Sequence, residues 1–164
     1  PNVELAEAAG IACANGIIVD QDGRTSVPNI FAAGDCASQL SPIYDCRMRL
    51  ESVNNAIEQA KTAAAAMCGK SKPFTQTPWF WSDQYDLKLQ TAGISRGYDE
   101  IVVRGVPASG SFAVFYLQGG RLLAVDAINR PAEFILARTL IPKRAQVSTR
   151  RLADDGIAVK ELAA

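Results

Sequence analysis

The sequence predicts an α+β fold built on an antiparallel sheet, and three observations indicate this. After residue 78, apolar and polar residues alternate in short runs separated by turn residues, which is typical of strands. Gly119-Gly120 stands between two such runs and predicts a tight hairpin, because both turn positions need a positive φ. Helical segments flank the strands, and helices packed on one face of an antiparallel sheet bury the apolar residues of both.

The first third of the chain predicts two strands and a loop. Gly16–Asp20 is a predicted strand, and Asp22-Gly23 after it predicts a turn that leads back toward Thr25. Ile30 to Ala33 form a continuous apolar run, as expected of a strand covered on both faces. Residues 38–50, rich in serine, proline and arginine, are interpreted as a loop.

A helix is predicted next, followed by a boundary. Ser52 is a good N-cap, and Gly69 can close the C-terminus. Val53, Ala56, Ile57, Ala60, Ala64 and Met67 recur near helical spacing and predict the packed face. Residues 70–78 contain two prolines and polar residues, and the pattern changes there from helix to strands.

Four strands and two helices are predicted beyond this boundary, after a dense aromatic cluster at Trp79–Asp83. Pro131 is suited to the first position of an apolar helix that ends by Pro142, and Ser148–Asp155 is a short second helix. The predicted strands are Leu87–Ala92, Glu100–Arg104, Ser111–Gln118 and Arg121–Ile128.

Composition excludes several classes of function. The 164 residues are 48% hydrophobic, which suits one or two globular domains. Lysine and arginine together number 17, as do aspartate and glutamate, so no bulk charge predicts binding to nucleic acid or a membrane surface. No apolar run approaches the roughly 18 residues of a spanning helix, and no signal peptide opens the chain.

The cysteines predict no metal site. Cys13, Cys36, Cys46 and Cys68 form no C-x-x-C pair, and the chain has no histidine to complete a mixed zinc site. We interpret them as free thiols in a reducing cytoplasm. A redox pair between Cys36 and Cys46 is the alternative.

Gly34-Asp35 is the candidate ligand-binding point. A glycine that ends a strand lets a ligand come close, and Asp35 then offers an acceptor for sugar or ribitol hydroxyls, as at the crevice where open α/β sheets bind dinucleotides. The alternative is that Asp35 caps a turn.

Three segments, in order, resemble one family. Thr25-x-x-x-x-Ile-Phe-Ala-x-Gly-Asp35 closely resembles the second FAD-binding motif of the two-dinucleotide-fold flavoprotein reductases, the pyridine nucleotide-disulfide oxidoreductase superfamily. Arg49–Gln59 and Pro78–Gln84 resemble segments of its branch of ferredoxin and rubredoxin reductases from bacterial oxygenase systems, and more distantly apoptosis-inducing factor.

The resemblance covers essentially the whole chain, but only the C-terminal part of such a reductase. It implies that residues 1–69 end an FAD-binding domain and that residues 74–164 form the reductase C-terminal α+β domain. No G-x-G-x-x-G motif follows a strand. We therefore expect a fragment of a larger enzyme, without catalytic residues of its own and inactive in isolation.

The same resemblance implies flavin contacts. Asp35, next to Gly34, would anchor the ribitol chain, and Glu51, Ser52 and Val53 at the helix start would face the pyrimidine side of the isoalloxazine ring. Trp81, supported by Phe80, would pack near the ring. A scaffold helix and aromatic core packing are the alternatives.

Arg47 and Arg49 are candidates for contact with a partner. Positive charge near the flavin edge would stabilise a reduced flavin and attract an acidic ferredoxin, whereas the alternative is two solvated arginines. The implied function is electron transfer from NAD(P)H through FAD to a ferredoxin or rubredoxin that feeds an oxygenase, in a protein that could form a homo-oligomer. The alternative is an interaction module of the apoptosis-inducing-factor type.

Overall fold

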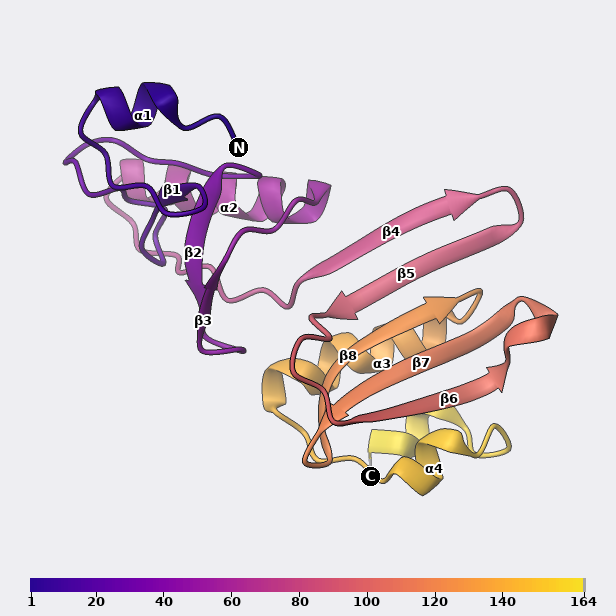
Figure 1. Ribbon diagram of the computed structural model, residues 1–164. Coiled ribbons are helices and arrows are strands. Elements are labelled where there is room, and N and C mark those ends of the chain that lie inside the picture. Colours follow the sequence, from indigo (N-terminus) through magenta and orange to yellow (C-terminus); the bar gives the residue numbers. More distant parts are fainter. Residues whose placement is uncertain (164) are drawn as a thin grey trace. The chain divides into compact units, whose positions relative to one another are not determined.

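The computed structural model describes residues 1–163, which divide into two compact units, residues 1–76 and residues from 77 onward (Figure 1). The first unit contains α1 (Glu4–Ala8), β1 (Ile17–Ile18), β2 (Ala37–Ser41), β3 (Cys46–Met48) and α2 (Val53–Met67). The second contains β4 (Trp79–Gln84), β5 (Leu87–Gly93), β6 (Glu100–Val106), η1 (Pro107–Ser109), β7 (Ser111–Gln118), β8 (Arg121–Ile128), α3 (Pro131–Leu140), η2 (Ile141–Lys143), α4 (Thr149–Ala153) and η3 (Val159–Ala163).

The first unit holds a small mixed sheet in the order β1-β2-β3. β1 pairs with β2 in parallel, with Ile17 opposite Ala37, and β2 pairs with β3 antiparallel. The predicted turn at Asp22-Gly23 is confirmed, since Gly23 has a φ of +79° and the Asp20 N–H donates to the Arg24 carbonyl.

The strand predicted at Ile30–Ala33 is wrong. Phe31 makes one isolated bridge to Arg24, and Ile30 is 38% exposed. The parallel partner of β1 starts after Gly34, at Ala37, so the glycine precedes the strand and does not end it. An apolar run without a neighbouring ladder forms no strand, since its backbone groups bond locally here.

The interpretation of residues 38–50 as a loop is also wrong, because β2, a turn and β3 occupy most of this segment. β2 buries three polar side chains, those of Ser38, Gln39 and Ser41, and exposes Leu40. This pattern is the reverse of an amphipathic strand, and the sequence therefore looked like a loop.

The ends of α2 are confirmed, but the buried face is not the one that apolar spacing predicted. The Ser52 hydroxyl accepts from the Asn55 N–H, and Lys70 and Gly69 donate to the Ala65 and Ala66 carbonyls in a Schellman closure with Gly69 at a φ of +73°. The buried residues of α2 are Asn55, Gln59, Thr62, Ala63 and Ala66, whereas Val53, Ile57, Ala60, Ala64 and Met67 are exposed. No helix within residues 1–163 is long and apolar enough to cross a membrane.

The second unit confirms the predicted antiparallel sheet with helices on one face. Its strand order is β4-β5-β8-β7-β6, and the β7–β8 turn has a φ of +55° at Gly119 and +79° at Gly120. α3 packs on β8 and β5, and α4 packs on β6. One row of paired residues that crosses the sheet beneath the helices forms the core: Trp79, Ala92, Val125, Phe115 and Val102.

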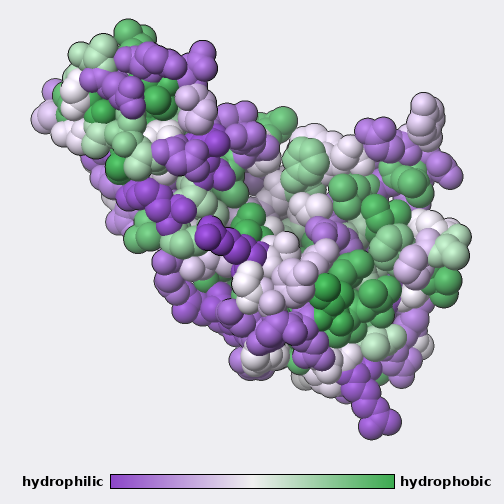
Figure 2. All heavy atoms as spheres, viewed as in Figure 1, coloured by the Kyte–Doolittle hydropathy of each residue, from purple (hydrophilic) through white to green (hydrophobic). Residues whose placement is uncertain are grey.

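The other face of this sheet is largely apolar and open to solvent. Directly opposed residues share a face, so the row from Phe80 through Thr91, Asp126 and Val114 to Val103 lies on the side without helices. Phe80 is 44% exposed and Val103 is 43% exposed. Figure 2 shows hydrophobic residues gathered over these strands.

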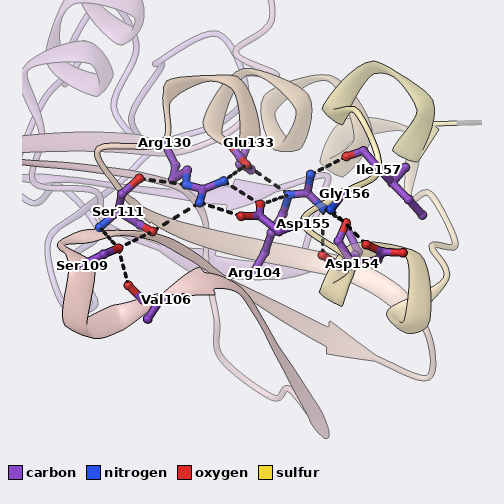
Figure 3. A network of polar contacts seen from close by, with 11 residues as sticks. Arg104, Val106, Ser109, Ser111, Arg130, Glu133, Asp154, Asp155, Gly156 and Ile157 are labelled. Atoms are coloured by element: carbon purple, nitrogen blue, oxygen red, sulfur yellow. Dashed lines mark hydrogen bonds and ion pairs between the residues drawn. The ribbon is translucent and has the colours of Figure 1, made fainter.

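A buried arginine connects the C-terminal segment to the helix-covered face (Figure 3). Arg104 of β6, 2% exposed, donates to the backbone carbonyls of Leu152, Asp154 and Ile157. Its Nε lies 3.2 Å from the carboxylate of Glu133 on α3, which is also 2% exposed. The guanidinium therefore joins the sheet, α3 and the chain around α4.

Replacing Arg104 should strongly destabilise the second unit. Arg104→Met leaves the buried Glu133 carboxylate with Arg130 alone, 3.3 Å away, and removes one hydrogen bond from each of the three carbonyls, so we expect a loss of about 3 kcal/mol or more in the free energy of unfolding. Urea unfolding followed by tryptophan fluorescence measures it. Arg150→Met, at an exposed arginine of α4, is the control and should change stability by less than about 0.5 kcal/mol. Equal losses in both variants would contradict the role assigned to Arg104.

Acid should weaken the same network through Asp155. Arg130 donates two hydrogen bonds to Asp155, of 2.7 and 2.9 Å, and these bonds hold the pKa of that carboxyl below its ordinary value. A lowered pKa in the folded state adds stability above the unfolded pKa of about 3.9, and this stability disappears as the pH falls through the folded pKa. The difference in urea midpoint between wild type and Asp155→Asn should be constant above about pH 5 and shrink below about pH 4. A difference that does not change between these pH values would contradict it.

Candidate functional site

The first unit brings three predicted segments together at the start of α2. The Gly34 N–H donates to Oε1 of Gln59 at 2.7 Å, which anchors the Gly34-Asp35 turn on the helix. Nη1 of Arg49 lies 2.7 Å from the Asp35 carbonyl oxygen and 2.8 Å from Oε1 of Glu51. Hydrogen bonds therefore link the turn, the chain after β3 and the residue that precedes the helix cap.

Gly34 is favoured by backbone geometry and packs against α2. Its φ is +82°, in the left-handed region that strongly favours glycine. A Cβ at this position would lie 3.5 Å from the Cβ of Ala56. The side of Gly34 that was predicted to be open to a ligand therefore faces α2, and the glycine places the turn against the helix.

Asp35 presents an unengaged carboxylate. The residue is exposed, and within residues 1–163 its side chain accepts no hydrogen bond. The turn is closed by backbone atoms, with the Ala37 N–H donating to the Gly34 carbonyl at 3.0 Å. The carboxylate does not cap the turn and can accept hydrogen bonds from a ligand.

The first turn of α2 offers main-chain donors. The Asn55 N–H donates to the Ser52 hydroxyl and the Ala56 N–H to the Ser52 carbonyl, whereas the Val53 and Asn54 N–H groups have no acceptor in the described part of the chain. These two groups stand at the positive end of a helix of 15 residues. Val53 is 58% exposed, so this end of the helix is open to a ligand. The arrangement suits a negatively charged or electron-rich ligand atom.

Sequence reasoning missed two residues that shape this site, Asn55 and Gln59. Asn55 is 2% exposed, and its side-chain amide donates to the Leu50 carbonyl at 2.8 Å, which fixes the chain before the cap. Its Oδ1 is buried and has no partner among the described residues. The signal was present in the sequence, because Asn55, Gln59 and Thr62 are uncharged polar residues at the i, i+4 and i+7 positions of one helical face.

The two arginines considered for contact with a partner both bond within the first unit. Arg47 donates from Nη1 to the carbonyls of Ser38 at 2.6 Å and Val19 at 3.3 Å. The side chain of Arg49 is 15% exposed and contacts Asp35 and Glu51. Neither guanidinium is a freely solvated charge, and Arg47 is the more exposed of the two residues.

Trp81 and Phe80 belong to the second unit and lie on opposite faces of its sheet. Trp81 pairs with Gln90 on the helix-covered side, where its ring centroid is 5.4 Å from that of Trp79. Phe80 therefore does not pack behind the Trp81 indole, since neighbouring residues of a strand point in opposite directions, and its contact with a flavin stays a prediction.

The indole of Trp81 continues an aromatic stack outward from the core. The ring centroid of Trp79 is 5.7 Å from that of Phe134 on α3, and the guanidinium of Arg138 lies over both rings. Trp81 itself is 40% exposed. It lines a hollow of about 500 Å³ together with Asp83, Lys88, Gln90, Asn129 and Pro131. A packed but accessible indole can present its ring to a flat ligand.

Known proteins match the chain over its whole length. It is 49% identical to putidaredoxin reductase of Pseudomonas putida over 164 residues, covering 100% of this chain and 39% of that protein. It is 42% identical to a ferredoxin–NAD(P)(+) reductase of a Sphingomonas species over 149 residues, covering 90% of this chain and 36% of that protein. The chain thus spans about two fifths of the length of these relatives.

Solved structures of ferredoxin reductases also match the chain. A covalent complex of putidaredoxin reductase with putidaredoxin matches with a TM-score of 0.93 and 49% identity, covering 99% of this chain and 39% of that one. A ferredoxin reductase from Rhodopseudomonas palustris matches with a TM-score of 0.93 and 44% identity, covering 100% of this chain and 41% of that one.

Two family models match the chain, one in each unit. The model described as "Reductase C-terminal" matches residues 79–163, and the model described as "Pyridine nucleotide-disulphide oxidoreductase" matches residues 1–60. The chain therefore belongs to the reductase C-terminal family, with a pyridine nucleotide-disulphide oxidoreductase segment before that domain.

Proposed function

We propose that this chain is the C-terminal part of a flavoprotein that transfers electrons from NAD(P)H through FAD to a ferredoxin or rubredoxin. One observation carries the proposal: Arg49 links the Asp35 turn to the start of α2, and there the Asp35 carboxylate and the Val53 and Asn54 N–H groups have no partner among residues 1–163. The matched relatives include reductases named for ferredoxins, and one solved relative is bound to putidaredoxin.

The residues at this site fit FAD. The Asp35 carboxylate can accept hydrogen bonds from ribityl hydroxyls, and the Val53 and Asn54 N–H groups can donate to the electron-rich pyrimidine edge of the ring. Bound FAD would supply the chemistry, because a flavin accepts two electrons from a nicotinamide and can release them singly. The contribution of the first unit would be to orient the cofactor. Trp81 of the second unit, packed and 40% exposed, is the aromatic residue that we propose for contact with the flavin ring.

We propose that residues 1–69 end the FAD-binding domain and that residues 74–164 form the C-terminal reductase domain. Residues 1–164 contain no G-x-G-x-x-G motif, so a glycine-rich cradle for the pyrophosphate of either nucleotide is not among them. Arg47, exposed on the β2–β3 hairpin, is the arginine that we propose for contact with an acidic ferredoxin. The low exposure of Arg49 does not favour such a contact.

The function is tested by comparing the full-length protein with residues 1–164. The full-length protein should purify with bound flavin, oxidise NADH or NADPH, and reduce a ferredoxin or rubredoxin, whereas residues 1–164 with added FAD should give no turnover of NADH with ferricyanide. Absorbance at 340 nm and the visible flavin spectrum report both results. A full-length protein without flavin would contradict the proposed function. Robust turnover by residues 1–164 would show that this chain alone is sufficient for oxidation of NADH.

Removing the Asp35 carboxylate should weaken FAD binding. A hydrogen bond to a charged group contributes about 1.5–3 kcal/mol, so Asp35→Ala should raise the Kd of full-length apoprotein for FAD by about 10-fold to 100-fold. Quenching of flavin fluorescence during titration measures it. Glu4→Ala, at an exposed carboxylate on α1, is the matched control and should leave the Kd unchanged. Equal Kd values in the two variants would remove Asp35 from the site.

A further inference from the structure

Arg49 occupies a slot where four segments of the first unit meet. Its Nη1 contacts the Asp35 carbonyl and the Glu51 carboxylate, and its Nε lies 3.3 Å from Oδ1 of Asn15 in the turn before β1. The side chain comes from the residue that directly follows β3. A single guanidinium thus cross-links the turn before β1, the Asp35 turn before β2 and the chain after β3, just beyond the ladders that pair these strands.

The backbone at Gly16 leaves room for the side chain of Arg49. Gly16 has a φ of +117°, and a Cβ there would lie 2.4 Å from Cδ of Arg49 and 2.6 Å from the Cys36 carbonyl oxygen. Any larger residue at position 16 would collide with the arginine stem. The close approach of Gly16, together with 15% exposure of the side chain, holds the guanidinium in one place.

The contacts require an arginine and not merely a positive charge. The planar guanidinium donates along several directions at once, and here it reaches a backbone carbonyl, a carboxylate and an amide oxygen. A lysine ammonium on its flexible stem cannot hold all three acceptors in the same geometry. The neighbouring Glu51 carboxylate offsets the positive charge, so the main effect of Arg49 is on position.

We propose that Arg49 is a positioning residue for the flavin: it fixes the Asp35 turn and the approach to α2 so that the Asp35 carboxylate and the free N–H groups of the helix start act on one bound cofactor. This inference rests on the proposed function. It replaces the role in partner contact that the sequence suggested for Arg49.

The test uses the full-length protein with Arg49→Met and Arg49→Lys, and with Arg24→Met as the matched control. Arg24 also donates to a backbone carbonyl, that of Ala66, but at the opposite end of α2. Three quantities are measured: the melting temperature of the apoprotein, the Kd for FAD, and the visible circular dichroism of the bound flavin.

Both Arg49 variants should raise the Kd for FAD by about 10-fold or more, because a misplaced Asp35 turn would cost roughly one charge-assisted hydrogen bond to the cofactor. Both variants should also alter the visible circular dichroism of the bound flavin. Arg24→Met should lower the melting temperature and leave the Kd within about twofold of wild type. Arg49→Lys keeps the charge and the aliphatic stem, so it provides a folded variant even if Arg49→Met does not fold.

Two results would separate the possible failures. If Arg49→Lys binds FAD with the Kd and dichroism of the wild type, the position of the flavin does not depend on Arg49. The inference is then overturned, while the proposed function stands. If the wild-type full-length protein binds no FAD, the proposed function itself fails, and this inference fails with it.

Discussion

A buried charge must be fully partnered, and the second unit is organised around that constraint. The side chain of Arg104 is buried on the helix-covered face of the sheet, where an unpaired guanidinium would cost several kcal/mol. Its partners are the carboxylates of Glu133 on α3 and, at 3.5 Å, Asp155, together with three carbonyls between residues 152 and 157. The arginine therefore bonds the Leu152 and Ile157 carbonyls and adds a second hydrogen bond to the Asp154 carbonyl, which also accepts from the Ile157 N–H, and it holds the C-terminal segment against the sheet.

The first unit uses the same kind of interaction at a smaller scale. Its strands are short, two to five residues, and its buried surface includes amides and hydroxyls as well as apolar groups. Arg49 binds a carbonyl of the Asp35 turn, and Gln59 binds an N–H of the same turn. Side chains thus do here what backbone ladders do in the second unit, and they leave the Asp35 carboxylate and the Val53 and Asn54 N–H groups without partners among residues 1–163.

This arrangement explains how a unit with little regular structure can hold a precise site. Hydrogen bonds from buried side chains fix the backbone on either side of the candidate ligand groups, while those groups themselves face solvent. In the second unit the stack of Phe134, Trp79 and Trp81 restrains an indole that is still accessible. Each unit therefore holds its exposed polar or aromatic groups on a rigid support.

Local signals were read correctly from the sequence, because each depends on the residue's own conformational preference. The Gly119-Gly120 hairpin, the Ser52 cap and the Gly69 closure follow from permitted φ values or from a hydroxyl beside an N–H, and the alternating strands of the second unit follow from the pleat. The Gly34-Asp35 motif and the aromatic segment after Pro78 identified the family for the same reason, since they are contiguous residues. The opposite directions of Phe80 and Trp81 were also available from the pleat alone.

Only the tertiary structure decided which surfaces are buried. The spacing of Val53, Ile57 and Met67 predicted the packed face of α2, yet Asn55, Gln59 and Thr62 are the buried residues, because the neighbouring backbone offers partners to polar groups. β2 was not recognised for the same reason. Apart from the Arg49–Glu51 pair, the contacts of Arg49 and Arg104 join residues that are 14 to 53 positions apart, and pairing over such distances depends on the folded backbone and not on local pattern. The sequence by itself determined the ends of α2, the Gly119-Gly120 hairpin and the family, whereas the fold assigned the polar side chains to their partners.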